Sequence, residues 1–169
     1  GSISLYALAG LNRGDQLSNE ASLKYFLLGS LASCIFIYGI ALLYVSLSII
    51  GLYEINIAIN YIGLNNVPLT SFIGIIFIIV GLLFKVAAAP FQAWAPDVYQ
   101  GSPTGYVGYM AAVAKAASFI VLARLITVSL RFILDQFDLF FSAVVILSVL
   151  GGALFATNQS DLKRLIAYS

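Results

Sequence analysis

The sequence has 169 residues, of which 62% are hydrophobic and only 9% are charged, and its net charge is +1. Soluble domains carry about 25% charged residues, so this composition indicates a polytopic membrane protein and gives no sign of nucleic-acid binding. The single cysteine, Cys34, excludes an internal disulfide and a cysteine-only metal site, and the sequence has no histidine, the commonest metal ligand.

Apolar runs long enough to cross a bilayer alternate with short polar connections, and a spanning helix needs about 20 residues. These runs predict four complete spans with a partial span at each end: 1–12 (partial), 20–50, 69–95, 105–131, 139–157 and 162–169 (partial). Polar connections or loops are expected at 12–19, 51–68, 96–104, 131–138 and 158–161. The expected architecture is an all-α, polytopic helical membrane bundle that forms one domain over residues 1–169.

The span at 69–95 holds a lysine and, five residues later, a proline. On insertion scales Lys85 costs about 2.5–3.5 kcal/mol at a helix centre, and the ~15 apolar residues around it offset that cost at about 0.3–0.6 kcal/mol each. Pro90 removes a backbone donor and clashes with the preceding turn, so a discontinuous helix is predicted between Lys85 and Pro90. A broken helix at membrane depth is tolerated only where it faces protein or a water-filled cavity. The break therefore predicts a functional site.

All four lysines are candidate proton-path residues: Lys24, Lys85, Lys115 and Lys163. Burial disfavours the charged form of an amine, and an ionisable residue inside a membrane is a functional hypothesis by default. Lys85 and Lys115 lie deepest in their spans, which favours a role in proton transfer. Lys24 lies one turn inside its span and can instead extend its amine to the lipid headgroups. Lys163 begins the last helix beside Arg164, for which an anchoring role is expected.

The acidic residues lie near the ends of the expected spans. Asp97 follows the break and can cap a turn or pair with a lysine, and the turn role is favoured. Ser18 or Asn19 is expected to cap the second helix, with Glu20 in its first turn. Asp135 and Asp138 are expected to lie in a solvated turn. Trp94 and the tyrosines are expected to form an aromatic belt at the membrane interface.

Positive charge is divided unequally between the two ends of the predicted bundle. Arg13, Lys163 and Arg164 lie at one end and Arg131 at the other. The positive-inside rule places the first end in the cytoplasm or matrix. The sequence also has no phosphate-binding glycine loop, nucleophile elbow or metal cluster, so we expect no redox centre, cofactor or metal in this chain.

Three stretches carry a resemblance to a known family: FKVAAAPFQAWAPDVYQGSPT (84–104), AVAKAASFIVLARL (112–125) and NQSDLKRLIAYS (158–169). They resemble subunit 2, the N-type antiporter-like subunit of the proton-pumping NADH:ubiquinone oxidoreductase, complex I, and the likeness runs essentially from end to end. Val98-Tyr99 is similar to subunit 2, whereas the related subunits 4 and 5 tend to have Ala-His there. The resemblance implies that the chain is a central fragment of a longer subunit with an antiporter-like fold.

Residue by residue, the resemblance implies a row of buried lysines. Lys85 matches the family's central lysine on its discontinuous helix, and Lys115 matches the lysine of the next helix. Lys24 matches a lysine near the start of the preceding span, and Lys163 matches one in the closing segment. The implied function is proton translocation coupled to electron transfer from NADH to ubiquinone.

The resemblance also implies the surroundings of the chain. Flavin and iron–sulfur clusters would belong to other subunits, and the partners would be the other membrane-arm subunits and the lipid bilayer. The mitochondrial inner membrane is the first expected location and a bacterial plasma membrane the second. Two positions depart from the family: Gln92 stands where it often has His, which removes a titratable group near Lys85, and Gly105 stands where it usually has Pro.

Three other interpretations remain open from the sequence. One is a subunit of a multisubunit cation/proton antiporter, which would lack a peripheral arm with flavin and iron–sulfur clusters. Another is the equivalent subunit of the plastid or cyanobacterial complex. The third is a purely structural membrane module, in which every lysine is paired or reaches the headgroups.

Overall fold

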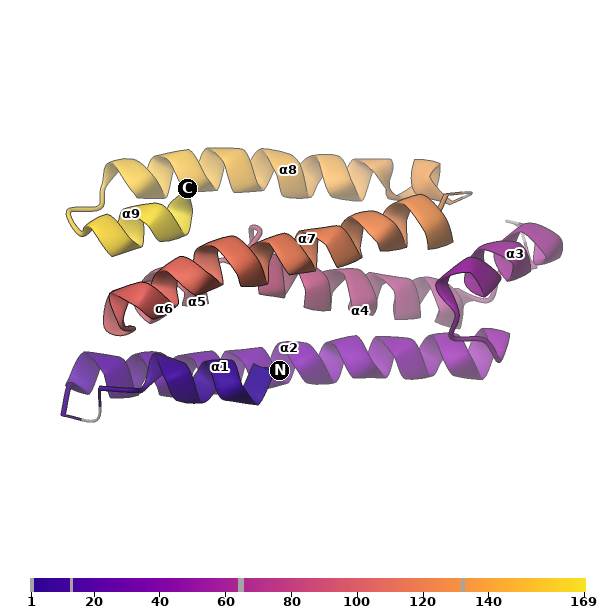
Figure 1. Ribbon diagram of the computed structural model, residues 1–169. Helices are drawn as coiled ribbons and strands as arrows, with labels where there is room; N and C mark the ends of the chain where they lie inside the picture. Colours follow the sequence, from indigo (N-terminus) through magenta and orange to yellow (C-terminus); the bar gives the residue numbers. More distant parts are fainter. Residues whose placement is uncertain (1, 13, 64–65, 132) are drawn as a thin grey trace.

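The computed structural model describes residues 2–12, 14–63, 66–131 and 133–169. These residues form helices and no strand, which confirms the all-α prediction (Figure 1). Arg13, part of the expected charge asymmetry, lies outside the described residues. In chain order the elements are α1 (Ser2–Ala9), α2 (Gln16–Leu47), α3 (Leu52–Ile62), α4 (Leu69–Val86), α5 (Trp94–Gly101), α6 (Thr104–Tyr109), η2 (Met110–Ala114), α7 (Lys115–Arg124), η3 (Leu125–Ser129), α8 (Leu134–Thr157) and α9 (Leu162–Tyr168).

Four helical segments within the described ranges are long and apolar enough to cross a membrane: Gln16–Leu47, Leu69–Val86, Thr104–Ser129 and Leu134–Thr157. They correspond to the four expected spans and run roughly along one direction, whereas α1 and α9 cover only part of that length (Figure 1). The α1–α2 and α8–α9 connections lie at one end, and the α2–α3 and η3–α8 connections lie at the other. The alternation of the connections between two ends therefore agrees with the prediction.

Two stretches expected to be connections are helices. The first is α3, which buries Ile55 and Ile59 on one face. The Asn56 side chain donates a hydrogen bond to the Val128 carbonyl at 2.6 Å, and the Ser129 hydroxyl donates to the Leu52 carbonyl at 2.9 Å. Packing, more than intrinsic propensity, stabilises short helices, and these contacts hold α3 against η3.

The second is α5, which lies where two prolines and a glycine predicted a loop. Pro96 occupies the first turn of α5, where backbone N–H groups have no intrahelical acceptor and a proline is tolerated. Two helix starts also differ from the prediction. Asp15, not Ser18 or Asn19, caps α2 and accepts from the Leu17 N–H at 3.0 Å. Helix α8 begins at Leu134, so both exposed carboxylates of the expected turn, Asp135 and Asp138, lie on a helix.

Helices α2 and α4 approach closely at a pair of glycines. A Cβ built on Gly39 would lie 2.7 Å from the Gly74 carbonyl oxygen, and one built on Gly74 would lie 2.9 Å from the Gly39 carbonyl oxygen. The hydroxyls of Ser71 and Ser46 form a hydrogen bond of 2.8 Å at the same interface. Small residues allow such close backbone contact between membrane helices. This contact holds α4, which carries Lys85, against the longest helix of the bundle.

Replacing Gly39 with alanine is expected to destabilise the protein by about 1–3 kcal/mol, because overpacked helix contacts must separate. Thermal unfolding of the purified membrane protein in one detergent would measure the change. Gly108→Ala is the matched control, since no described atom lies within 4 Å of a Cβ at this helical position. The control variant should be neutral or slightly stabilised. Equal losses for the two variants would contradict the close-contact account.

Candidate functional site

The helix that carries Lys85 is broken directly after it. Helix α4 ends at Val86, and Ala87 adopts a left-handed conformation with φ of 61°. The Ala89–Pro90 peptide bond is cis, and the helix resumes as α5 at Trp94. The predicted discontinuity between Lys85 and Pro90 is therefore confirmed.

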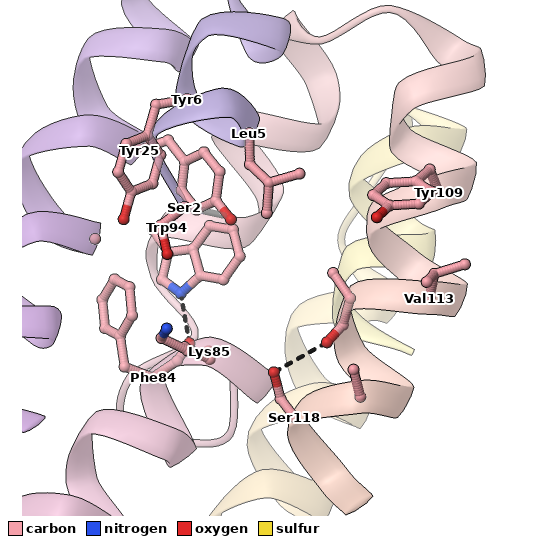
Figure 2. Close-up of a pocket in the computed structure, with 13 residues that line it drawn as sticks. Ser2, Leu5, Tyr6, Tyr25, Phe84, Lys85, Trp94, Tyr109, Val113 and Ser118 are labelled. Carbon is pink, nitrogen blue, oxygen red and sulfur yellow. Dashed lines mark hydrogen bonds between the residues drawn. The ribbon is translucent and has the colours of Figure 1, made fainter. Parts of the chain in front are cut away.

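Trp94 joins the two halves of the broken helix. Its indole N–H donates a hydrogen bond to the Phe84 carbonyl at 3.1 Å (Figure 2). Its ring stacks on Tyr25 of α2, with centroids 4.9 Å apart, and on Phe84 of α4, with centroids 5.5 Å apart. Tyr6 of α1 then meets the Tyr25 ring edge-on. Trp94 is only 4% exposed, so its expected place in an interfacial aromatic belt is wrong, and it packs α2, α4 and α5 together instead.

Lys85 lines a cavity of about 290 Å³ between α1, α2, the break and the η2–α7 segment (Figure 2). The Lys85 side chain is exposed within this chain, so the expected burial of this lysine is not found among the described residues. The wall also carries the hydroxyl-bearing side chains of Ser2, Tyr25 and Ser118. A cavity of this size holds several water molecules, each needing about 10–15 Å³. The arrangement suits exchange of a proton between the Lys85 amine and water.

Lys115 lies next to a π-helical turn and faces a different cavity. The π turn η2 ends at Ala114, directly before Lys115, and such turns are frequent at functional sites. The half-buried Lys115 places its amine 5.5 Å from the centroid of the Tyr99 ring on α5. Its cavity, of about 540 Å³, lies between the end of α4 and helices α7, α8 and α9. The aromatic face stabilises the ammonium form.

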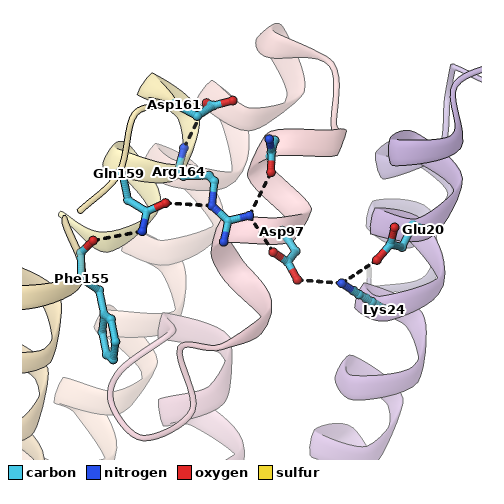
Figure 3. A network of polar contacts seen from close by, with 8 residues as sticks. Glu20, Lys24, Asp97, Phe155, Gln159, Asp161 and Arg164 are labelled. Carbon is cyan, nitrogen blue, oxygen red and sulfur yellow. Dashed lines mark hydrogen bonds and ion pairs between the residues drawn. The ribbon is translucent and has the colours of Figure 1, made fainter. Parts of the chain in front are cut away.

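Lys24 and Arg164 are joined through Asp97 (Figure 3). The Lys24 amine contacts Glu20 and Asp97, each at 2.7 Å, and the Arg164 guanidinium contacts Asp97 at 2.8 Å. Arg164 also donates to Gln100 and Gln159, each at 2.9 Å. The favoured turn-capping role of Asp97 is therefore wrong, because its carboxylate pairs with two cations. Arg164 is a paired residue within the bundle rather than a simple anchor.

The Asp97 network connects three helices at the end of the bundle that holds the α1–α2 and α8–α9 connections. It joins α2 through Lys24, α5 through Asp97 and α9 through Arg164. Burial alone would raise the pKa of the Asp97 carboxyl, but hydrogen bonds from Lys24 and Arg164 outweigh it and hold that pKa below its ordinary value. Asp97 therefore stays ionised and keeps α5 fixed between α2 and α9.

Lys163 also binds α5. Its amine donates a hydrogen bond to the Ser102 carbonyl at 2.9 Å, and its backbone N–H donates to Asp161, which caps α9. The four candidate lysines therefore do not meet in one place. Lys24 and Lys163 hold helices together at one end, whereas Lys85 and Lys115 line separate cavities beside the break. Neither Lys85 nor Lys115 pairs with a carboxylate of the described chain.

The sequence analysis missed the positioning roles of Trp94 and Tyr99, and it gave pairing of Asp97 with a lysine only as the less favoured alternative. One signal was available: Asp97 is the only acidic residue between Glu54 and Asp135, in a chain where charge is rare. A lone carboxylate among basic residues in a membrane protein is expected to find a cation. Within the described ranges, no group of three or more metal-ligating side chains comes together.

Comparison with known proteins adds to this geometry. The whole chain, residues 1–169, matches the family described as NADH:quinone oxidoreductase/Mrp antiporter, TM. It is 44% identical over 171 residues to NADH-quinone oxidoreductase subunit N 1 of Chloroherpeton thalassium, covering 99% of this chain and 35% of that protein. It is 41% identical over 170 residues to NAD(P)H-quinone oxidoreductase subunit 2 of Nostoc sp., covering 99% of this chain and 32% of that protein.

Two solved structures are similar in fold. One is respiratory complex I from Thermus thermophilus with bound aureothin, with a TM-score of 0.78 and 40% identity over 99% of this chain and 34% of that one. The other is the membrane-bound sulfane sulfur reductase, an archaeal respiratory membrane complex, with a TM-score of 0.82, 30% identity and the same coverage. The chain thus spans about a third of the length of the relatives that it matches.

Proposed function

Because the chain belongs to the NADH:quinone oxidoreductase/Mrp antiporter transmembrane family, we propose that it takes part in proton translocation as the central part of a subunit 2, or N-type, membrane subunit of an NADH:quinone oxidoreductase. The observation that carries the proposal is the position of Lys85, next to the helix break and facing a cavity of about 290 Å³. The subunit assignment rests on relatives named subunit N and subunit 2. The chain matches about a third of their length, which supports its assignment to a part of such a subunit.

In this proposal Lys85 and Lys115 exchange protons with water in their cavities. Moving one elementary charge across 100 mV involves about 2.3 kcal/mol. A cation–π contact is worth about 0.5–2 kcal/mol, so the contact between Lys115 and Tyr99 is comparable in size to the energy of moving one charge across that potential. Lys24 and Lys163 would support the row from the end where they bind α5.

The reaction partners and redox groups would lie outside this chain. We place flavin and iron–sulfur clusters in other subunits, and we place other membrane-arm subunits and lipid against the exposed apolar faces. The relatives named above are bacterial and cyanobacterial, so they favour a bacterial plasma membrane over the mitochondrial inner membrane as the location. The source of the intact complex would decide between these two membranes.

Lys85→Met is the experiment that tests the proposal. Proton translocation per NADH oxidised, measured in vesicles with the intact complex, should fall, because methionine has no group that binds and releases a proton near neutral pH. Lys85→Arg is the matched control, because arginine keeps the charge but does not release a proton. Both variants should assemble and both should lose translocation. Unchanged translocation in Lys85→Met would overturn the proposal, and full rescue by arginine would leave only an electrostatic role.

A subunit of a cation/proton antiporter is the second candidate, because the matching family includes Mrp antiporters. The two candidates differ in the proteins that accompany the chain. Purification of the native complex with its neighbours should recover flavin- and iron–sulfur-containing subunits under the first proposal. Their absence from an intact, active complex would favour the antiporter. Neither Lys85 nor Lys115 has a carboxylate partner among the described residues, which disfavours a purely structural module in which every lysine is paired.

A further inference from the structure

Tyr99 is the residue of α5 that reaches Lys115. Its side chain is fully buried in a cluster of aromatic and apolar residues from α1, α2, α5, α6, η2 and α9. The Lys115 amine lies over the face of this ring, 5.5 Å from the ring centroid. A ring in a close-packed cluster has little freedom to move. The place of the Tyr99 ring therefore sets the place of the ammonium group that it attracts.

Helix α5 is itself held at both ends and along its α2 side. At its start Trp94 bonds back to α4, and directly after its end the Lys163 amine donates to the Ser102 carbonyl at 2.9 Å. A Cβ built on Gly101 would collide with the Leu17 carbonyl oxygen of α2, so the two helices touch through their backbones. These contacts set the position of α5, and with it the position of its aromatic ring.

The Asp97 network and the Tyr99 ring belong to the same short helix. Asp97 pairs with Lys24 at 2.7 Å and with Arg164 at 2.8 Å (Figure 3). Residues two apart on an α-helix point about 200° away from each other. One side of α5 therefore carries the ion pairs, and the other carries the ring that contacts Lys115. A shift of Asp97 would move Tyr99 with it, because both lie within about one turn.

We propose that Tyr99 is a positioning residue for Lys115, and that the Asp97 network acts on Lys115 through this ring. The ring attracts the ammonium form electrostatically, whereas an uncharged amine loses that attraction. A charged Lys115 therefore rests against α5, and an uncharged one is free to turn into its cavity of about 540 Å³. The two protonation states of one amine then occupy different positions. Their use in transport rests on the proposed function, whereas the contact itself does not.

The first test measures how readily the Lys115 amine is acetylated in the intact complex. Acetic anhydride reacts only with an uncharged amine, and mass spectrometry reports the acetylation of Lys115 relative to that of Lys85, which lines the other cavity. In Tyr99→Leu this ratio should rise by about 2- to 30-fold, the change equivalent to a cation–π contact of about 0.5–2 kcal/mol. Tyr99→Phe keeps the face of the ring and should leave the ratio unchanged.

Two further variants separate the charge contact from packing. A phenylalanine fluorinated around its ring, placed at position 99, nearly keeps the shape of phenylalanine but loses the negative face, so it should raise the ratio as leucine does. Phe137→Leu, which truncates a buried aromatic residue of α8, should not raise it. An unchanged ratio with the fluorinated ring would overturn the positioning role of Tyr99, even if leucine raised the ratio.

The link from the Asp97 network to Lys115 is tested with the same ratio. Asp97→Asn should raise the ratio, and adding Tyr99→Leu should give no more than Tyr99→Leu alone, because the network acts through the ring. Glu20→Gln removes only the more exposed pair of Lys24 and should leave the ratio unchanged. An unchanged ratio in Asp97→Asn, or additive effects in the double variant, would overturn the link through α5.

Proton translocation per NADH oxidised in the same complexes tests the use of the contact in transport. Tyr99→Leu should lower translocation, and Tyr99→Phe should preserve it. Unchanged translocation in Tyr99→Leu, together with lowered translocation in Lys85→Met, would overturn the transport role of the contact. Unchanged translocation in both would instead count against the proposed function, and the acetylation ratio would still decide whether Tyr99 positions Lys115.

Discussion

Trp94→Ala should destabilise the protein by about 3–5 kcal/mol, the usual cost of truncating a buried tryptophan. The indole is 4% exposed and lies between the rings of Tyr25 and Phe84. Its removal takes away both stacked contacts and the hydrogen bond that joins α5 back to the Phe84 carbonyl. The two halves of the broken helix would then lose a direct side-chain link beside Lys85.

Trp94→Phe separates the two contributions of the side chain. Phenylalanine keeps an aromatic ring between Tyr25 and Phe84 but has no N–H to donate. The Phe84 carbonyl also accepts from the Ala87 N–H at 3.0 Å, so the loss should be limited to about 1 kcal/mol, the net value of one hydrogen bond. Thermal unfolding of the purified complex would measure both variants. A Trp94→Ala variant as stable as Trp94→Phe would contradict the stacking account.

Asp97→Asn should destabilise the protein by about 1.5–3 kcal/mol, the range for hydrogen bonds to charged groups. The side chain of Asp97 is 33% exposed, so the loss should stay below the cost of breaking a fully buried ion pair. The substitution removes the shared anion between Lys24 and Arg164, which holds α5 between α2 and α9. Glu20→Gln is the control: its side chain is 56% exposed, and loss of its pair with Lys24 should cost less than about 1 kcal/mol.

The contribution of Asp97 should depend on pH in a defined direction. Its folded pKa lies below the ordinary value because of Lys24 and Arg164, so the unfolded chain binds this proton more readily than the folded protein. The stabilisation is therefore present above the ordinary carboxyl pKa and is lost as the pH falls through the lower folded value. The stability difference between wild type and Asp97→Asn should narrow over that acidic range. A constant difference would exclude Asp97 as its source.

The break in the helix was predictable because its causes are local. Pro90 lacks a backbone donor wherever it stands, and Lys85 is costly in any apolar helix. The four lysines could likewise be selected as candidates from charge scarcity alone. Helix α3 was missed although Ile55 and Ile59 recur at the helical spacing of four residues. Helix α5 was missed because a proline suits a helix only in its first turn, where Pro96 lies.

Partners far apart in sequence account for the rest of the candidate site. Asp97 meets Lys24, 73 residues away, and Arg164, 67 residues away. The sequence alone determined an all-α, membrane-spanning chain with one broken helix and a few lysines that are costly to place in a bilayer. Hydrophobicity, proline geometry and charge determine these features because each acts within one segment. Only the tertiary structure decided which amines are paired and which face cavities, because hydrogen bonds, ion pairs and enclosed space depend on how separate helices come together.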